Sequence, residues 1–264
     1  PPLERTVGTI CRKIAKRIVS DPDFKSFSVK AQNLEELLGP KKFTKENLEK
    51  QDEVGLVNGL AWTSVGGERL PIEVAVMEGT GKIQLTGSLG DVMKESASAA
   101  LTCIRTRAEQ LGIAPDFYAK KDIHIHAPEG AVPKDGPSAG IAMATAITSA
   151  LCKVPILHSV AMTGEITLQG RVLPIGGLHE KSMAAYRSGI KTVFIPQANV
   201  PDLAEVDKVV KDHVEFIPVR RIDEVLPKAM PGILGGEHRA EPEALVPGGQ
   251  TQRGMPAPRP CGEA

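Results

Sequence analysis

The pattern of apolar and polar positions predicts helices in the N-terminal part of the chain. Between residues 3 and 19, apolar side chains recur every three or four positions, the spacing of one buried stripe on an amphipathic helix. The basic residues on the rest of this helix are interpreted as a solvated face. Asn33 is expected to cap a short second helix, LEELLG, that ends at Gly39. The charged run that follows, residues 41–53, indicates a domain boundary near residue 50.

Beyond this boundary, stretches that alternate with period two are interspersed with stretches of helical period. Strands are expected at residues 55–65, 69–78, 82–89, 122–127, 192–196 and 213–219, with a strand pair within 159–177. Helices are expected at residues 91–112, 139–152, 178–188 and 222–230. Such a mixture predicts an α+β or mixed α/β domain over residues 50–230. Residues 231–264 are rich in Gly, Pro and Ala with few large apolar groups, which predicts a disordered tail.

The composition excludes several classes of protein. The 32 basic and 32 acidic residues balance, so the electrostatic signature of a nucleic-acid binder is missing. Four scattered cysteines form no CxxC pair, which argues against a zinc site and suits a reducing compartment. No apolar stretch approaches the roughly 20 residues of a membrane helix, and the N-terminus lacks a signal-peptide pattern. The expected location is cytoplasmic, with no membrane contact.

Ser138 is the first candidate for chemistry. It lies in PKDGPSAG, directly before the run AGIAMATAITSALC, whose apolar residues on all sides predict a buried helix. The free backbone N–H groups and the positive dipole end of that helix would stabilise an anion near Ser138. Three interpretations remain open from this stretch: a phosphate cradle, an oxyanion hole beside a nucleophilic hydroxyl, or an ordinary N-cap serine.

A nucleophilic serine needs a base, and Lys181 in GGLHEKSMAAYRSG is the candidate. On a helix from residue 178, its neighbours are small, among them Ala184 and Ala185, and no carboxylate lies three or four positions away. Burial among such residues lowers the pKa of a lysine, so the neutral amine could act as a general base. Spacing alone does not bring Ser138 and Lys181 together.

Two other motifs carry less weight. His124 and His126 share one strand face and could supply two metal ligands, but no third or fourth ligand stands out. A histidine base in a catalytic triad is a stronger alternative, and structural roles are favoured over both. The segment EGTGK, residues 78–82, does not fit the Walker A pattern, because the required glycine and Ser/Thr are replaced by Val76 and Ile83. It is interpreted as a hairpin turn.

Taken together, PKDGPSAG, the preceding HIHAPEGAVPKDG, MTGEITLQGRVLPIGG and GGLHEKSMAAYRSG closely resemble the proteolytic domain of the Lon family of ATP-dependent proteases. The resemblance extends over residues 50–230. Residues 1–49 resemble the C-terminal part of the small helical subdomain of the AAA+ module. The resemblance implies an α+β fold with a mixed sheet, of the ribosomal S5 domain 2-like type.

The resemblance also implies functional residues. It makes Ser138 the nucleophile and Lys181 the base of a Ser/Lys endopeptidase, with Thr163 of MTGE orienting the lysine amine. Trp62, in GLAWTSVGG, would lie at the edge of a groove where an extended peptide adds as a strand. The loop from Lys134 to Pro137 would open or block the oxyanion hole. Unfolded polypeptides are the implied substrates, and a homo-oligomer in the form of a hexameric ring is the implied assembly.

The chain departs from the full family pattern, because Walker A and Walker B motifs are absent from it. No cofactor is therefore expected for this chain; ATP and Mg²⁺ would belong to an ATPase module outside it. Two other functions are alternatives to a peptidase. One is a Lon-like platform that assembles without catalysis, which would lack a dyad member. The other is a small-molecule kinase with a glycine-rich phosphate loop, in which Lys181 and MTGE have no role.

Overall fold

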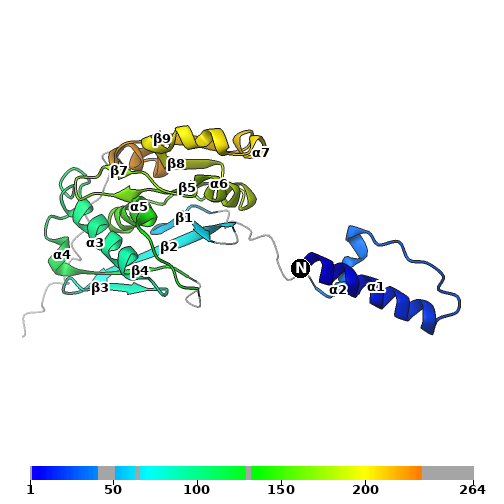
Figure 1. The fold of residues 1–264 in the computed structure, drawn as a ribbon. Coiled ribbons are helices and arrows are strands. Elements are labelled where there is room, and N and C mark those ends of the chain that lie inside the picture. The colour runs from blue at the N-terminus through cyan, green and yellow to red at the C-terminus, as the bar shows by residue number, and fades with distance from the viewer. Residues whose placement is uncertain (1, 41–50, 64–65, 129–131, 234–264) are drawn as a thin grey trace, which may run out of the picture.

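The computed structural model describes residues 2–40, 51–63, 66–128 and 132–233, and its centre is a mixed β-sheet (Figure 1). Across the described residues, the strand order in this seven-stranded sheet is β3-β4-β2-β1-β5-β8-β9. The strands are β1 (Leu56–Thr63), β2 (Gly66–Glu78), β3 (Ile83–Thr86), β4 (Lys121–His126), β5 (Val160–Met162), β8 (Thr192–Pro196) and β9 (Glu215–Val219). A separate hairpin consists of β6 (Glu165–Ile166) and β7 (Val172–Leu173).

The helices of the described residues are α1 (Pro2–Ser20), α2 (Leu34–Leu38), α3 (Asp91–Arg105), α4 (Phe117–Lys120), α5 (Gly140–Cys152), α6 (Leu178–Arg187), α7 (Lys208–Lys211) and α8 (Leu226–Ala229). Of these, α5 and α6 pack directly on β1 and β2. Short 3₁₀ turns are η1 (Ala31–Asn33), η2 (Pro137–Ala139), η3 (Gln197–Asn199), η4 (Pro201–Glu205) and η5 (Ile222–Glu224). The predicted α+β domain with a mixed sheet and a helical N-terminal segment is therefore confirmed.

The main core lies between the sheet and the pair α3 and α5, which pack side by side (Figure 1). As its composition predicted, α5 is buried on every side from Gly140 to Ser149. Because alternate residues of a strand point to opposite faces, Ile72 and Ile123 enter this core while Leu60 faces a second core under α6. Ala185 and Val193 belong to that second core.

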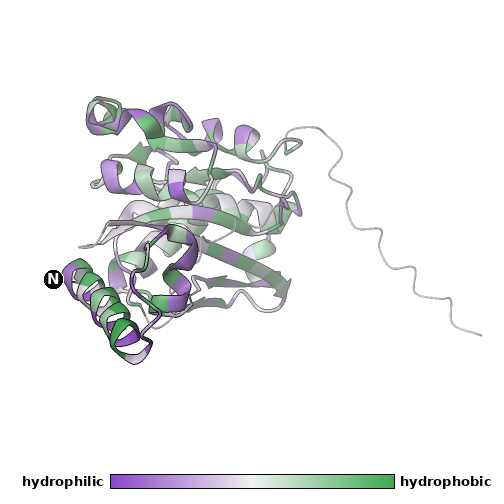
Figure 2. Ribbon diagram, turned by 90° about the vertical axis from the view of Figure 1, so that its right-hand side faces the viewer, coloured by the Kyte–Doolittle hydropathy of each residue, from purple (hydrophilic) through white to green (hydrophobic). Residues whose placement is uncertain are grey.

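The N-terminal helix forms as expected and is amphipathic, visible in Figure 2 as alternating hydrophilic and hydrophobic bands along α1. Its apolar stripe is only partly covered, since Val7 is 50% and Ile18 42% exposed. The expected Asn33 cap is wrong. Asn33 occupies the position before α2, but its side chain does not bond to that helix. Its amide oxygen accepts from the Lys30 N–H at 2.8 Å and its amide nitrogen donates to the Ser28 carbonyl at 2.9 Å, so it closes the preceding turn instead.

The interpretation of residues 78–82 as a hairpin turn is also wrong, because β2 and β3 are not neighbours. Strand β4 lies between them, antiparallel to β2 and parallel to β3. The segment therefore crosses the end of β4, where the Asp122 carboxylate accepts the Thr80 and Lys82 N–H groups, each at 2.8 Å. This long-range anchor has no signal in the local sequence.

The helix expected at residues 91–112 ends earlier, at Arg105. Two side chains bond to the carbonyl of Cys103: the Thr106 hydroxyl donates to it at 2.8 Å and the Arg107 guanidinium donates to it at 3.2 Å. Residues 106–112 form consecutive turns instead.

At the other end of the domain, the predicted disordered tail begins too early. Ile233 is buried in the main core, and residues 231–233 are described as a turn. The rest of the predicted tail, residues 234–264, lies outside the described residues.

A close backbone contact joins β2 to α6. A Cβ atom on Gly67 would lie 1.8 Å from the Glu180 carbonyl oxygen, so only glycine fits there without displacing the helix. The Arg187 guanidinium also donates to the Gly67 carbonyl at 2.8 Å. This contact sets the distance between the sheet and the first turns of α6, which include Lys181.

Candidate active site

Ser138 lies in the 3₁₀ turn η2, directly before α5, which confirms its expected position at the start of the buried helix. The N-cap residue of α5 is Ala139, and no side chain caps either η2 or α5. The ordinary N-cap interpretation is therefore wrong. The backbone of Ser138 is fixed from the other side: its carbonyl accepts the Gly164 N–H at 2.8 Å and the Thr163 hydroxyl at 3.4 Å.

Glycine at position 140 lets the start of α5 approach the β6–β7 hairpin. A Cβ atom there would lie 2.8 Å from the Ile166 backbone nitrogen and 3.1 Å from the Ser96 hydroxyl. The Ile141 N–H also donates to the Gly164 carbonyl at 3.1 Å. Together with the bond from Gly164 to Ser138, these contacts hold the serine turn against the link between β5 and β6, which carries Thr163.

The loop before Ser138 is held by the N-terminus of α3. The Asp135 carboxylate accepts the Met93 N–H at 3.0 Å and the Gly136 N–H at 2.9 Å. It thus takes the place of a local cap, since the N-cap residue of α3 is Gly90. Gly136 adopts φ of 120°, a conformation that favours glycine. Sequence reasoning missed this anchor because Asp135 and Met93 are far apart in the chain.

Lys181 lies on α6 and is buried, with only 1% of its surface exposed. Its amine donates to the Thr163 hydroxyl at 3.1 Å, and Thr163 is itself fully buried. Burial lowers the pKa of the lysine to about 8 from its ordinary 10.5. The small neighbours Ala184 and Ala185 are buried with it, as the helical-wheel argument predicted.

Ser138, Lys181 and Trp62 line one open cleft of about 430 Å³, so the fold brings together residues that are far apart in the sequence. The walls come from the loop at residues 135–137 and from the segment 174–176 that leads into α6. Thr163 lies behind the cleft and bonds to the Lys181 amine and to the Ser138 carbonyl. Asn199, which sequence reasoning also missed, fixes the Ile175 backbone through two hydrogen bonds.

Trp62, on β1, is 58% exposed at the rim of this cleft. Its ring packs closely on Gly177, where a Cβ atom would lie 2.7 Å from the indole and where φ is +69°. Strand β5 pairs with β1 only at Asn58 and Gly59. Beyond Gly59, the edge of β1 that faces β5 therefore has no partner in that strand.

A second hollow of about 140 Å³ adjoins Ser138 on the other side. Its lining includes the apolar side chains Leu70, Met93 and Pro133.

The two histidines share a strand face, as expected. Both rings bond to the Thr86 hydroxyl, at 2.8 Å from His124 and 2.7 Å from His126. In the described part of the chain, no group of three or more His, Cys, Asp or Glu side chains is arranged to hold a metal ion. A search of the same residues finds no helix that is long and apolar enough to cross a membrane.

Comparison with known proteins identifies the class of this domain. Residues 28–232 match the family model of the Lon protease (S16) C-terminal proteolytic domain, and the chain belongs to this family. It is 56% identical over 228 residues to Lon protease of Vibrio parahaemolyticus and 55% identical over 229 residues to Lon protease of Escherichia coli strain K12. Each alignment covers 86% of this chain but only 29% of the relative. The chain thus spans less than a third of the length of these proteases.

The buried amine makes the folding stability depend on pH. Between pH 8 and 10.5 the unfolded chain holds more protons on Lys181 than the folded chain, so stability rises with pH across this window. Below pH 8 the folded state bears the full cost of charging the amine, about 3 kcal/mol. Lys181→Met removes this cost and loses a hydrogen bond worth about 1 kcal/mol. The variant should therefore be more stable than the parent at pH 7, with a difference that shrinks as the pH rises to 10.

Urea unfolding of both proteins at several pH values measures this difference. Lys191→Met, at an exposed position, is the matched control and should show no such trend. A difference between Lys181→Met and the parent that stays constant from pH 7 to pH 10 would contradict the lowered pKa.

Proposed function

We propose that this domain is a serine endopeptidase in which Ser138 is the nucleophile and Lys181 is the general base. The observation that carries the proposal is the buried Lys181 amine, with its lowered pKa, in the same cleft as a serine at the start of a buried helix. A lysine becomes useful as a base near neutral pH only when its charged form is disfavoured. Relatives that share more than half of their aligned residues with this chain are named Lon proteases.

The proposed reaction has two stages. In the first, the Lys181 amine takes the Ser138 proton, and the serine oxygen attacks the scissile carbonyl. Backbone N–H groups near the start of α5 stabilise the oxyanion. The amine leaving group departs with the proton returned by Lys181, and an ester to Ser138 remains. In the second, water attacks that ester with Lys181 as base and releases the new carboxylic acid.

Thr163 serves this reaction by orienting the amine. Its hydroxyl accepts from Lys181 and donates to the Ser138 carbonyl, which fixes the direction of the lysine side chain relative to the serine turn. An accepting hydroxyl interacts with both the neutral and the charged amine, so it aligns the base without holding it protonated as a carboxylate would.

The proposed substrate is an unfolded polypeptide. Beyond Gly59, β1 presents main-chain groups that no residue of β5 pairs with, beside Trp62 and the cleft. An extended peptide can add there as a strand, which requires an unfolded backbone. The hollow on the other side of Ser138, with Leu70 and Met93, would accept an apolar side chain next to the bond that is cut.

The longer context belongs to the proposal as well. Relatives more than three times as long as the matched region leave room for an ATPase module that delivers unfolded chains. In that context we place the domain in a homo-oligomeric, hexameric ring in the cytoplasm. No cofactor is assigned to this chain, because the proposed chemistry uses only the serine, the lysine and backbone N–H groups.

Removal of either proposed catalytic group should abolish turnover. Ser138→Ala removes the nucleophile and Lys181→Met removes the base, so cleavage of an unfolded, fluorescently labelled polypeptide should fall by at least about a thousandfold in each. Ser98→Ala, at an exposed position on α3, and Lys191→Met are matched controls and should retain activity. Measurable turnover in a folded Ser138→Ala or Lys181→Met protein would contradict the assignment.

The rate of cleavage should follow deprotonation of Lys181. Because the neutral amine is the active form, kcat/KM should rise through an apparent pKa near 8 and level off above it. Initial rates on a labelled peptide from pH 6 to pH 9.5, with circular dichroism to confirm folding at each pH, test this. A flat profile across that range would rule out Lys181 as the base.

A further inference from the structure

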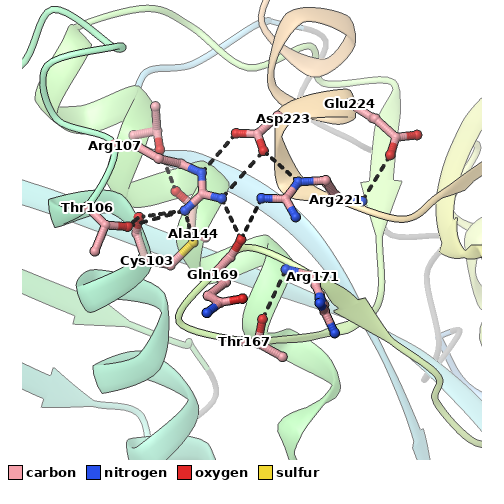
Figure 3. Close-up of polar contacts among 11 residues, drawn as sticks. Cys103, Thr106, Arg107, Ala144, Thr167, Gln169, Arg171, Arg221, Asp223 and Glu224 are labelled. Atoms are coloured by element: carbon pink, nitrogen blue, oxygen red, sulfur yellow. Dashed lines mark hydrogen bonds and ion pairs between the residues drawn. The ribbon is translucent and has the colours of Figure 1, made fainter.

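A polar cluster lies away from the cleft, around the tip of the β6–β7 hairpin (Figure 3). Its centre is Arg107, which is only 8% exposed and comes from the turn after α3. The guanidinium of Arg107 donates to the Gln169 carbonyl at 2.6 Å and to the Asp223 carboxylate at 2.9 Å. Arg221 donates to the same two groups, at 2.8 Å and 3.3 Å. We call Arg107, Arg221, Asp223 and the Gln169 carbonyl the hairpin clamp.

The clamp adds to two other supports of the hairpin: Ile166 and Val172 are buried in the main core, and the Ile222 N–H donates to the Gly170 carbonyl at 2.9 Å. The ladder between β6 and β7 consists of two residue pairs, and so short a hairpin is not stable alone. Leu168 at its tip is 53% exposed, so apolar packing does not hold the tip. Gly170, next to the carbonyl that the arginines bind, has φ of +76°, and a Cβ atom there would lie 2.3 Å from the Arg107 guanidinium. The tip is thus shaped to fit the buried arginine.

Both ends of the hairpin lead to the proposed catalytic residues. Upstream, Thr163 and Gly164 precede β6, and they bond to Lys181 and to Ser138. Downstream, residues 174–177 run from β7 along the cleft wall into α6, which carries Lys181. A shift of the hairpin would therefore move the support of the serine turn relative to the lysine helix.

We propose that Arg107 is a positioning residue for the peptidase reaction: through the hairpin clamp it sets the relative placement of Ser138 and Lys181. This inference rests on the proposed function. Small displacements of reacting groups cost catalysis steeply, on the order of 100-fold for about 1 Å. Loss of the clamp should accordingly lower the rate of the chemical step, while the main chain of β1, which is held by its pairing with β2, is left in place.

The test uses the full chain with Arg107→Met, Arg107→Lys and Asp223→Asn. Arg105→Met is the matched control, because Arg105 belongs to the same helix end but stacks on Tyr118 and, among the described residues, makes no hydrogen bond or ion pair with the hairpin. For Arg107→Met, kcat on a labelled peptide should fall roughly 10- to 100-fold with KM changed less than about twofold. Arg107→Lys keeps the charge but lacks the guanidinium fork, so its kcat should lie between Arg107→Met and the parent.

A second measurement follows the position of the hairpin without using activity. Amide hydrogen exchange at Gly164 and Ile141, whose bonds join the hairpin base to the serine turn, should accelerate in Arg107→Met and Asp223→Asn and stay unchanged in Arg105→Met. If Arg107→Met does not fold, Asp223→Asn and Arg107→Lys carry the comparison.

The outcomes separate the two proposals. Unchanged kcat and unchanged exchange in folded clamp variants would overturn the positioning role and leave the Ser/Lys assignment standing. Equal losses of kcat in Arg107→Met and Arg105→Met would also overturn it, as a general effect on stability. Turnover that persists in Ser138→Ala would overturn the proposed function itself, whatever the clamp variants do.

Discussion

The site depends on one constraint: the Lys181 amine is buried, and no carboxylate in the described part of the chain pairs with it. A buried cation normally acquires an acidic partner, which keeps it charged and inert as a base. Here the amine has a threonine hydroxyl as its partner, and burial alone lowers its pKa to about 8. Burial of this amine costs stability at neutral pH, as expected for a general base in the proposed active site.

The rest of the fold holds the serine turn and the helix that carries Lys181 against each other. Glycine at position 67 lets the backbone of β2 approach that of α6, and glycine at position 140 lets the start of α5 approach the backbone of β6. Asp135 ties the loop before Ser138 to α3, and the hairpin clamp ties the opposite side to the turn after the same helix. The serine turn is therefore supported from both ends of α3, although no residue of that helix has a proposed role in the chemistry.

Local patterns predicted the features that depend on local physics. The apolar composition of α5 on all sides predicted its burial and the position of Ser138 at its start. The small-residue face around Lys181 followed from helical periodicity. The features that were mispredicted depend on partners far away in the chain. The path of residues 79–82 depends on their hydrogen bonds to Asp122. The early end of α3 depends on Arg107, whose side chain donates to the Cys103 carbonyl of the helix and to the Gln169 carbonyl of the hairpin. The spacing of Ser138 and Lys181 in the sequence also does not predict that they share a cleft. In the sequence, only the resemblance to the Lon family connects these two residues.

The central claim is that Lys181 loses its proton near pH 8 rather than near the ordinary lysine value of 10.5, and direct titration tests it. The Cε resonances of isotopically labelled lysines can be followed by NMR from pH 6 to pH 11, with Lys181 assigned by its absence in Lys181→Met. The account predicts a midpoint near pH 8 for this one signal. A midpoint at the ordinary lysine value near 10.5 would contradict it.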